Sequence, residues 1–199
     1  SAPENIPWGG QVQDGGAVLG FSYFDLLGRL RTLGPDDAWD RLRAILDWFG
    51  EVQDEGGYRA YYAKPGRGTL QGGGPPGGLG MDHEFMESVL VPQVMLYGFL
   101  GLEPRPGGLK LDPKLPAAWP SLTVTRIQAQ GRVLDVTAEP GVIRVSPRVA
   151  DESPFALWLP AGRWETMVDG KTEAFQAGDE PRTLHLQVGR TQEFRRAED

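Results

Sequence analysis

The chain of 199 residues contains no cysteine and only two histidines. Disulfide bonds and thiolate metal sites are therefore excluded, and the sequence does not indicate a redox compartment. No apolar run approaches the ~20 residues that span a bilayer, and the start at Ser1 has neither a methionine nor a signal-peptide pattern. We expect a soluble chain that was processed or cut from a longer one, and its location stays unknown.

Basic residues are in the minority, because 20 Lys and Arg stand against 27 Asp and Glu, giving a net charge of -7. Nucleic acids and anionic membranes bind basic patches, so neither is expected as a partner. A neutral carbohydrate is compatible with this acidity. His83 and His185 are far apart in the sequence, and we expect no metal and no cofactor.

The first half of the chain has helical periodicity. Residues 17–30 are apolar on nearly every face, which predicts an interior helix. Gly34-Pro35-Asp36-Asp37 is typical of a joint between two helices, and the helix that follows, over residues 35–55, is amphipathic. A third helix is expected over residues 82–100, apolar all round and kinked at Pro92.

The second half changes to short alternating runs. Turn residues separate these runs, which predicts an antiparallel β-sandwich or barrel. The expected strands cover residues 122–127, 132–137, 142–145, 155–159 and 183–188. The predicted fold class is α+β, with three long helices in residues 1–102, a linker at 103–108, and an antiparallel β-sandwich in residues 109–199.

Polar residues gather before the two interior helices. A glycine-rich loop runs from Gly68 to Gly80 and leads into the polar segment Met81–Glu87. The outer helix runs back between the two interior helices, so both interior helices should begin at the same end. The segments at residues 8–14 and 58–84 should therefore meet.

Two motifs carry a resemblance to a known family. The stretch Trp8–Gly16, WGGQVQDGG, resembles the segment that opens a late inner helix of the six-hairpin glycosidases, with Asp14 where the family has asparagine. The stretch Leu109–Pro120, LKLDPKLPAAWP, resembles the lead-in to their C-terminal β-sandwich. The resemblance implies that the helices belong to an α/α toroid. A complete toroid has twelve helices, so the chain would be its C-terminal portion.

Glycoside hydrolysis needs two carboxyl groups, one to protonate the leaving oxygen and one to attack or to activate water. The candidates are Asp14, Asp82, Glu84 and Glu87. The resemblance implies a base or water-positioning carboxylate in this cluster, with Glu84 as first choice and Glu87, which His83 can reach at i-4, as second. Acids in a first helical turn also cap free N–H groups, and this alternative stays open, above all for Asp82.

Other side chains near these acids suit sugar binding. Aromatic rings such as Trp8 and Tyr61 could stack on sugar rings, and the amides of Gln11, Gln13 and Gln71 could bond to hydroxyl groups. Packing and ordinary loop roles are the alternative for each. The predicted substrate-binding residues are Trp8, Gln11, Gln13, Gln71, His83 and Tyr61.

The leading functional hypothesis is a C-terminal fragment or subunit of a glycoside hydrolase that cleaves glycosidic bonds by acid/base catalysis and is incomplete alone. The alternative is a non-catalytic assembly module. Interior helices without their toroid neighbours would expose apolar surface, so we expect a homo-oligomer or a partner chain that supplies the missing helices. A carbohydrate-binding sandwich is disfavoured, because residues 122–194 do not cluster aromatics. The sugar, the linkage, the stereochemistry and activity of the chain alone stay open.

Overall fold

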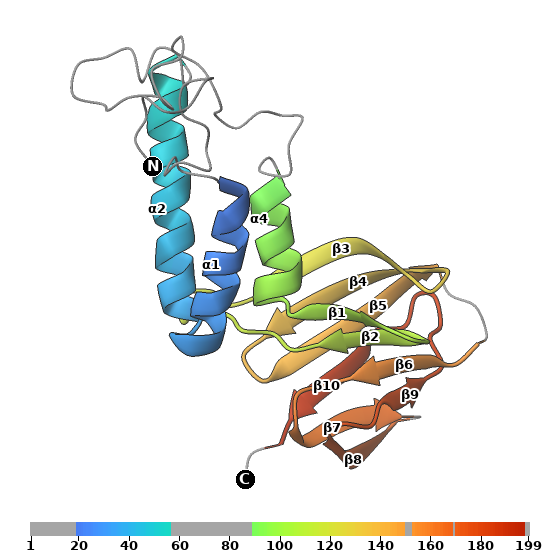
Figure 1. The fold of residues 1–199 in the computed structure, drawn as a ribbon. Coiled ribbons are helices and arrows are strands. Elements are labelled where there is room, and N and C mark those ends of the chain that lie inside the picture. The colour runs from blue at the N-terminus through green and yellow to red at the C-terminus, as the bar shows by residue number, and fades with distance from the viewer. Residues whose placement is uncertain (1–18, 57–88, 150–152, 169, 198–199) are drawn as a thin grey trace. The chain divides into compact units, whose positions relative to one another are not determined.

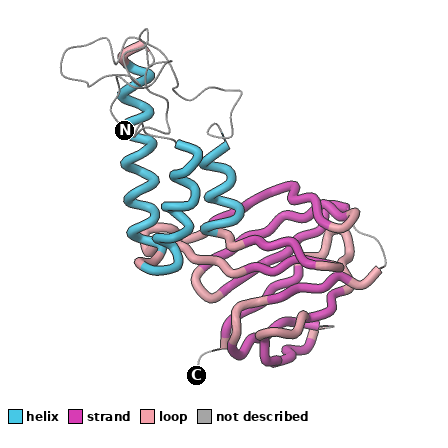
Figure 2. The backbone as a smooth tube through the Cα atoms, viewed as in Figure 1, coloured by secondary structure: helices cyan, strands magenta, loops and turns pink. Residues whose placement is uncertain are grey.

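The computed structural model describes residues 19–56, 89–149, 153–168 and 170–197. The chain divides into two units, Ser1–Val94 and Met95–Asp199. The described part of the first unit is helical, and the second is built mainly of strands (Figure 2). Each unit is described in turn.

Two long helices open the described chain, α1 over Leu19–Thr32 and α2 over Pro35–Asp54. The joint between them has the expected chemistry. Gly34 adopts a φ of 99°, which favours glycine, and its N–H donates to the Arg29 carbonyl at 2.9 Å. Pro35 then occupies the first turn of α2, where its missing N–H costs nothing.

The amphipathic pattern of α2 is confirmed. Leu42 and Ile45 are buried on one side of the helix. The charged residues expected on the other side are exposed: Asp40, Arg41, Arg43, Asp47 and Glu51.

Helix α1 is not the interior helix that its composition predicts. Leu26 and Leu30 are buried, but Phe24 is 66% exposed. Among the described helices, α1 packs against α2 and against α4 (Leu90–Gln93). Figure 1 shows the three helices side by side, with α1 and α4 beginning at the same end, as the connectivity predicts.

Ion pairs join α1 to α2. Asp25 accepts hydrogen bonds from Arg29 on its own helix and from Arg41 on α2, each at 3.1 Å. Arg29 also donates to Asp37 at 2.7 Å. These groups are partly exposed to solvent, so the ion pairs contribute little to the free energy of unfolding. They do link specific positions on the two helices.

A third long helix is not present in the described residues. Its expected start, residues 82–88, lies outside them, and the rest is the four-residue helix α4 followed by the π-helix η5, Val94–Phe99. Pro92 is the third residue of α4, so it lies in the first turn, where its missing N–H removes no hydrogen bond within the helix.

The second unit contains two β-sheets. The four-stranded sheet has the order β1-β2-β6-β9 and the six-stranded sheet the order β3-β4-β5-β10-β7-β8. The first comprises β1 (Leu102–Arg105), β2 (Gly108–Leu111), β6 (Phe155–Trp158) and β9 (Arg182–Leu184). The second comprises β3 (Leu122–Ala129), β4 (Arg132–Glu139), β5 (Val142–Val149), β10 (Gln192–Arg196), β7 (Gly162–Val168) and β8 (Lys171–Ala177).

The sandwich is confirmed, with two corrections. Strands β2 and β6 pair in parallel, so the four-stranded sheet is mixed and not wholly antiparallel. Residues 103–108 are not a linker, because β1 and β2 form a hairpin across them. Pro104 is tolerated there because β1 is an edge strand, where a missing N–H breaks no ladder bond.

Buried side chains from both sheets form one apolar core. Leu111, Phe155 and Leu157 come from the four-stranded sheet, and Leu134 and Phe194 from the six-stranded sheet. All five are fully buried. At about 25 cal/mol per Å² of apolar area, the burial of these side chains is the main force that holds the sheets together.

The segment that joins β2 to β3 contains the LKLDPKLPAAWP motif. Leu109 and Leu111 are buried on β2, and Pro116 is buried after it. The Trp119 ring lies 4.8 Å from the Phe99 ring, measured between centroids. The motif therefore carries the chain from one sheet to the other and covers the end of the core.

Gly108 on β2 lies close to the backbone of β6. A Cβ atom added there would lie 1.7 Å from the carbonyl oxygen of Ala156 on β6. No side chain can be accommodated at this distance unless the parallel pair separates. The pairing of β2 with β6 therefore depends on this glycine.

We predict that Gly108→Ala destabilises the protein by at least about 2 kcal/mol, because it forces β2 away from β6. Gly178→Ala is the matched control, since an added Cβ there has nothing within 4 Å and the glycine has no positive φ. Urea unfolding of both variants measures the difference. Equal free energies of unfolding would show that the close approach does not exist.

Candidate functional site

All of the predicted site residues lie outside the described residues. The catalytic candidates among them are Glu84, Glu87 and Asp14, and the substrate-binding candidates are Trp8, Gln11, Gln13, Gln71, His83 and Tyr61. Their roles remain predictions. Within the described ranges, no three His, Cys, Asp or Glu side chains are grouped closely enough to hold a metal ion. Of the helices described, none is both long and apolar enough to cross a membrane.

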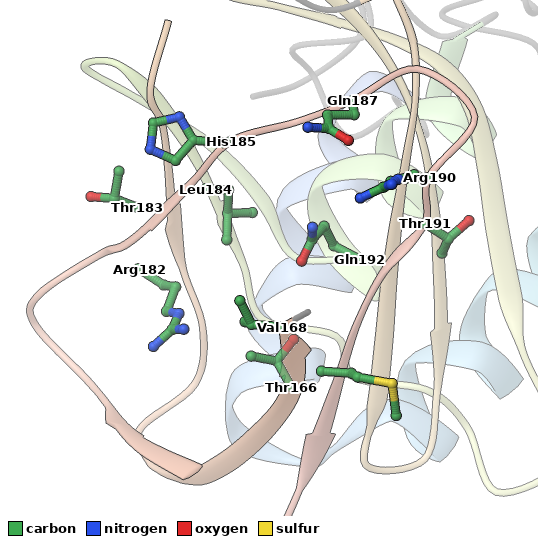
Figure 3. A pocket seen from close by; sticks show the side chains of 11 residues that line it. Thr166, Val168, Arg182, Thr183, Leu184, His185, Gln187, Arg190, Thr191 and Gln192 are labelled. Carbon is green, nitrogen blue, oxygen red and sulfur yellow. The ribbon is translucent and has the colours of Figure 1, made fainter. Parts of the chain in front are cut away.

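A polar pocket lies in the β-sandwich. Its volume is about 510 Å³, and its lining residues come from β7, from β9, and from the chain that leads from β9 into β10. Figure 3 shows the side chains of Arg182, Thr183 and His185 on one side and those of Gln187 and Arg190 on the other. We call it the β9–β10 pocket.

The early end of β9 creates this pocket. Alternation predicts a strand over residues 183–188, but β9 ends at Leu184. The chain then leaves the four-stranded sheet and turns toward β10, with the N–H of Arg190 donating to the Gln187 carbonyl at 3.0 Å. Gly189 has a φ of 81°, which permits the turn. Leu186 is buried like Leu184, so buried and exposed side chains continue to alternate beyond the end of the strand.

Most of the lining side chains are polar or charged. They are Thr166, Arg182, Thr183, His185, Gln187, Arg190, Thr191 and Gln192. No carboxylate belongs to the described lining. A hydrolytic centre needs a pair of carboxyl groups, so the described groups of this pocket can bind a ligand but cannot hydrolyse a glycoside.

The two arginines of the β9–β10 pocket differ in their partners. Arg182 donates to the Glu173 carboxylate, and its guanidinium lies 4.7 Å from the centroid of the Phe175 ring. Both contacts direct the Arg182 guanidinium toward β8. Arg190 is exposed and forms no ion pair with any residue that the structure describes.

A second hollow, of about 400 Å³, lies beside the edge strands β1 and β3. Its lining is mainly apolar and includes Leu96, Leu102 and Ile127. Strand β3 is irregular here, because the register shifts between Val124 and Ile127 and Arg126 has a φ of 60°. Such bulges end regular pairing at a sheet edge.

The exposed face of the six-stranded sheet carries paired charges. Arg144 on β5 lies opposite Glu193 on β10, and its Nε donates to the Glu193 carboxylate at 2.6 Å. The Nε of Arg195 donates to the same carboxylate at 2.6 Å. The hydrogen bond from Arg144 above all, with that from Arg195, lowers the pKa of Glu193 below its ordinary value of 4.5.

A comparison with protein-family models found a match to part of this chain. Residues 102–159 match the family model for the glycosyl hydrolase family 65 C-terminal domain. This stretch runs from β1 through β6 and covers less than a third of the chain. It includes the LKLDPKLPAAWP motif, one of the two motifs on which the resemblance to glycosidases rests.

Among solved structures, the chain is similar to a putative kojibiose phosphorylase from the human microbiome. The identity is 16% and the TM-score is 0.32, and the match covers 50% of this chain and 12% of that protein. The chain therefore corresponds to only a small part of that protein's length. No curated protein matches this chain.

The Arg144–Glu193 pair gives a testable pH dependence. The pKa of Glu193 is lower in the folded state, so its contribution to stability is present above about pH 4.5 and is lost as the pH falls through the lowered pKa. We predict that Arg144→Gln destabilises the protein at about pH 7 and that this difference shrinks toward about pH 3.

Urea unfolding across this pH range measures the effect. Arg163→Gln is the control, because Arg163 is an exposed arginine that forms no ion pair with a described residue. A difference between Arg144→Gln and wild type that stays constant with pH would contradict the role of Glu193.

Proposed function

We propose that this chain is the C-terminal part of a glycoside-cleaving enzyme related to glycosyl hydrolase family 65. The match of residues 102–159 to the C-terminal domain of that family carries the proposal. The LKLDPKLPAAWP segment supports it, because it joins the two sheets within the matched region. The carbohydrate would be the partner of the intact protein.

The catalytic groups would lie at the beginning of the helices. We assign the base or water-positioning role to Glu84, with Glu87 and Asp14 as the other candidate carboxylates. Trp8 and Tyr61 would stack on sugar rings, whose C–H faces suit aromatic surfaces. The common end at which α1 and α4 begin supports this arrangement, because the segments that precede both helices carry these residues.

The polar side chains would complete the sugar site. Gln11, Gln13 and Gln71 would bond to sugar hydroxyl groups, and His83 would contact Glu87 or the substrate. The second carboxyl group that hydrolysis requires would come from Asp14 or from helices outside this chain, since the proposed α/α toroid has more helices than this chain supplies.

The alternative is a module whose role is assembly. In this alternative the exposed Phe24 on α1 would be one point of contact with further helices. Those helices would belong to a partner chain or to a second copy. This alternative assigns no chemistry to Glu84.

The decisive experiment compares Glu84→Gln and Glu87→Gln in the longest polypeptide that contains this chain. We predict that Glu84→Gln lowers kcat for glycoside cleavage by about 10²–10⁴-fold, as loss of a general base does. Asp47→Asn is the matched control, an exposed acid on α2 that should leave kcat unchanged. Near-normal cleavage in both glutamine variants would refute the catalytic assignment and favour the assembly module.

A further inference from the structure

We propose that the β9–β10 pocket binds a small hydroxylated molecule that carries an oxyanion, either a carboxylate or a phosphate. The proposal concerns the β-sandwich alone and does not depend on where glycosides are cleaved. It rests on the charge of the pocket, on the way its arginines are held, and on its size.

The charge of the pocket is opposite to that of the chain. The protein has a net charge of -7, yet the described lining contains two guanidinium groups, an imidazole and no carboxylate. The Glu173 carboxylate lies beside Arg182, whereas Arg190 has no ion-pair partner among the described residues, so a ligand anion would pair with Arg190 first. The guanidinium group also presents parallel N–H donors that match the oxygens of a carboxylate or a phosphate.

One of these arginines is already oriented. The Glu173 carboxylate and the Phe175 ring hold Arg182, so little conformational entropy is lost when it meets a ligand. Arg190, across the pocket in Figure 3, has no described ion-pair partner and can supply charge to the ligand. The ligand would thus lie between a fixed guanidinium and an adaptable one.

The remaining side chains favour a ligand with hydroxyl groups. Gln187 and Gln192 offer amide donors and acceptors, and Thr183 offers a hydroxyl. The Thr166 hydroxyl already donates its hydrogen bond to the Glu193 carbonyl, at 2.7 Å. The volume of about 510 Å³ is in the usual range for small-molecule sites, which favours a small ligand over the surface of a protein.

The test measures binding of three probes to the full chain by calorimetry: inorganic phosphate, glucuronate and uncharged glucose. We expect at least one of the two anions to bind with a Kd below about 10 mM, more tightly than glucose, and more weakly as salt is added. Phosphate and glucuronate together distinguish which oxyanion the pocket prefers. Failure of both anions to bind would overturn the proposal, and so would equal binding of glucose and the anions.

Arg190→Gln should weaken anion binding by about tenfold or more, since it removes one guanidinium and keeps hydrogen-bonding capacity. Arg163→Gln is the matched control and should bind the anion as the wild type does. Arg190 is exposed in a turn, so its variant should unfold at the wild-type temperature. Equal weakening by both variants would show a general charge effect and refute the site.

Backbone amide shifts in NMR spectra locate the ligand independently of any variant. Addition of the tighter-binding anion should move the signals of residues 182–192 and of Thr166. Shifts confined to other parts of the chain would place the anion elsewhere and overturn the assignment. Loss of activity is not a readout here, so the result is separate from that of the Glu84 experiment.

Discussion

The sharing of one apolar core by two sheets is the interaction on which the second unit depends. Phe155 from the four-stranded sheet and Phe194 from the six-stranded sheet are both fully buried in it. The parallel contact of β2 with β6 at Gly108 aligns the smaller sheet, and β9 pairs with β6 in turn. The β9–β10 pocket exists because the chain must leave β9 and cross to the other sheet at this edge.

The described helices also bury apolar side chains, among them Leu26, Leu30 and Leu42. Helices α1 and α2 are aligned by the ion pairs of Asp25 and Arg29, and α2 places its charged side chains toward solvent. Phe24 on α1 is exposed. The described helices therefore combine a small apolar contact with solvated ion pairs, whereas the two sheets share an extended apolar core.

Sequence periodicity predicted the positions of β3, β4, β5 and β6, but it missed β1, β2, β7, β8 and β10 and extended β9 beyond its end at Leu184. The side chains of β4 are alternately buried and half-buried, and the position of this strand was predicted closely. Strand β8 was missed because an edge strand buries almost nothing, and only Ala177 is buried in it. The hairpin at 103–108 was read as a linker, because Pro104 and Gly107 are equally typical of linkers and of edge strands with tight turns. The β9–β10 pocket could not be predicted, since its residues meet through the turn at Gly189 and not through any spacing.

Hydrogen exchange of the backbone amides tests the shared core most directly. If both sheets depend on one core, the amides of β2 and β6 should become exposed only in the same cooperative opening as those of β4, β5 and β10, and should show the same free energy of opening. Exchange in β2 and β6 with a clearly lower free energy than in the six-stranded sheet would contradict the account. It would show that the smaller sheet opens on its own.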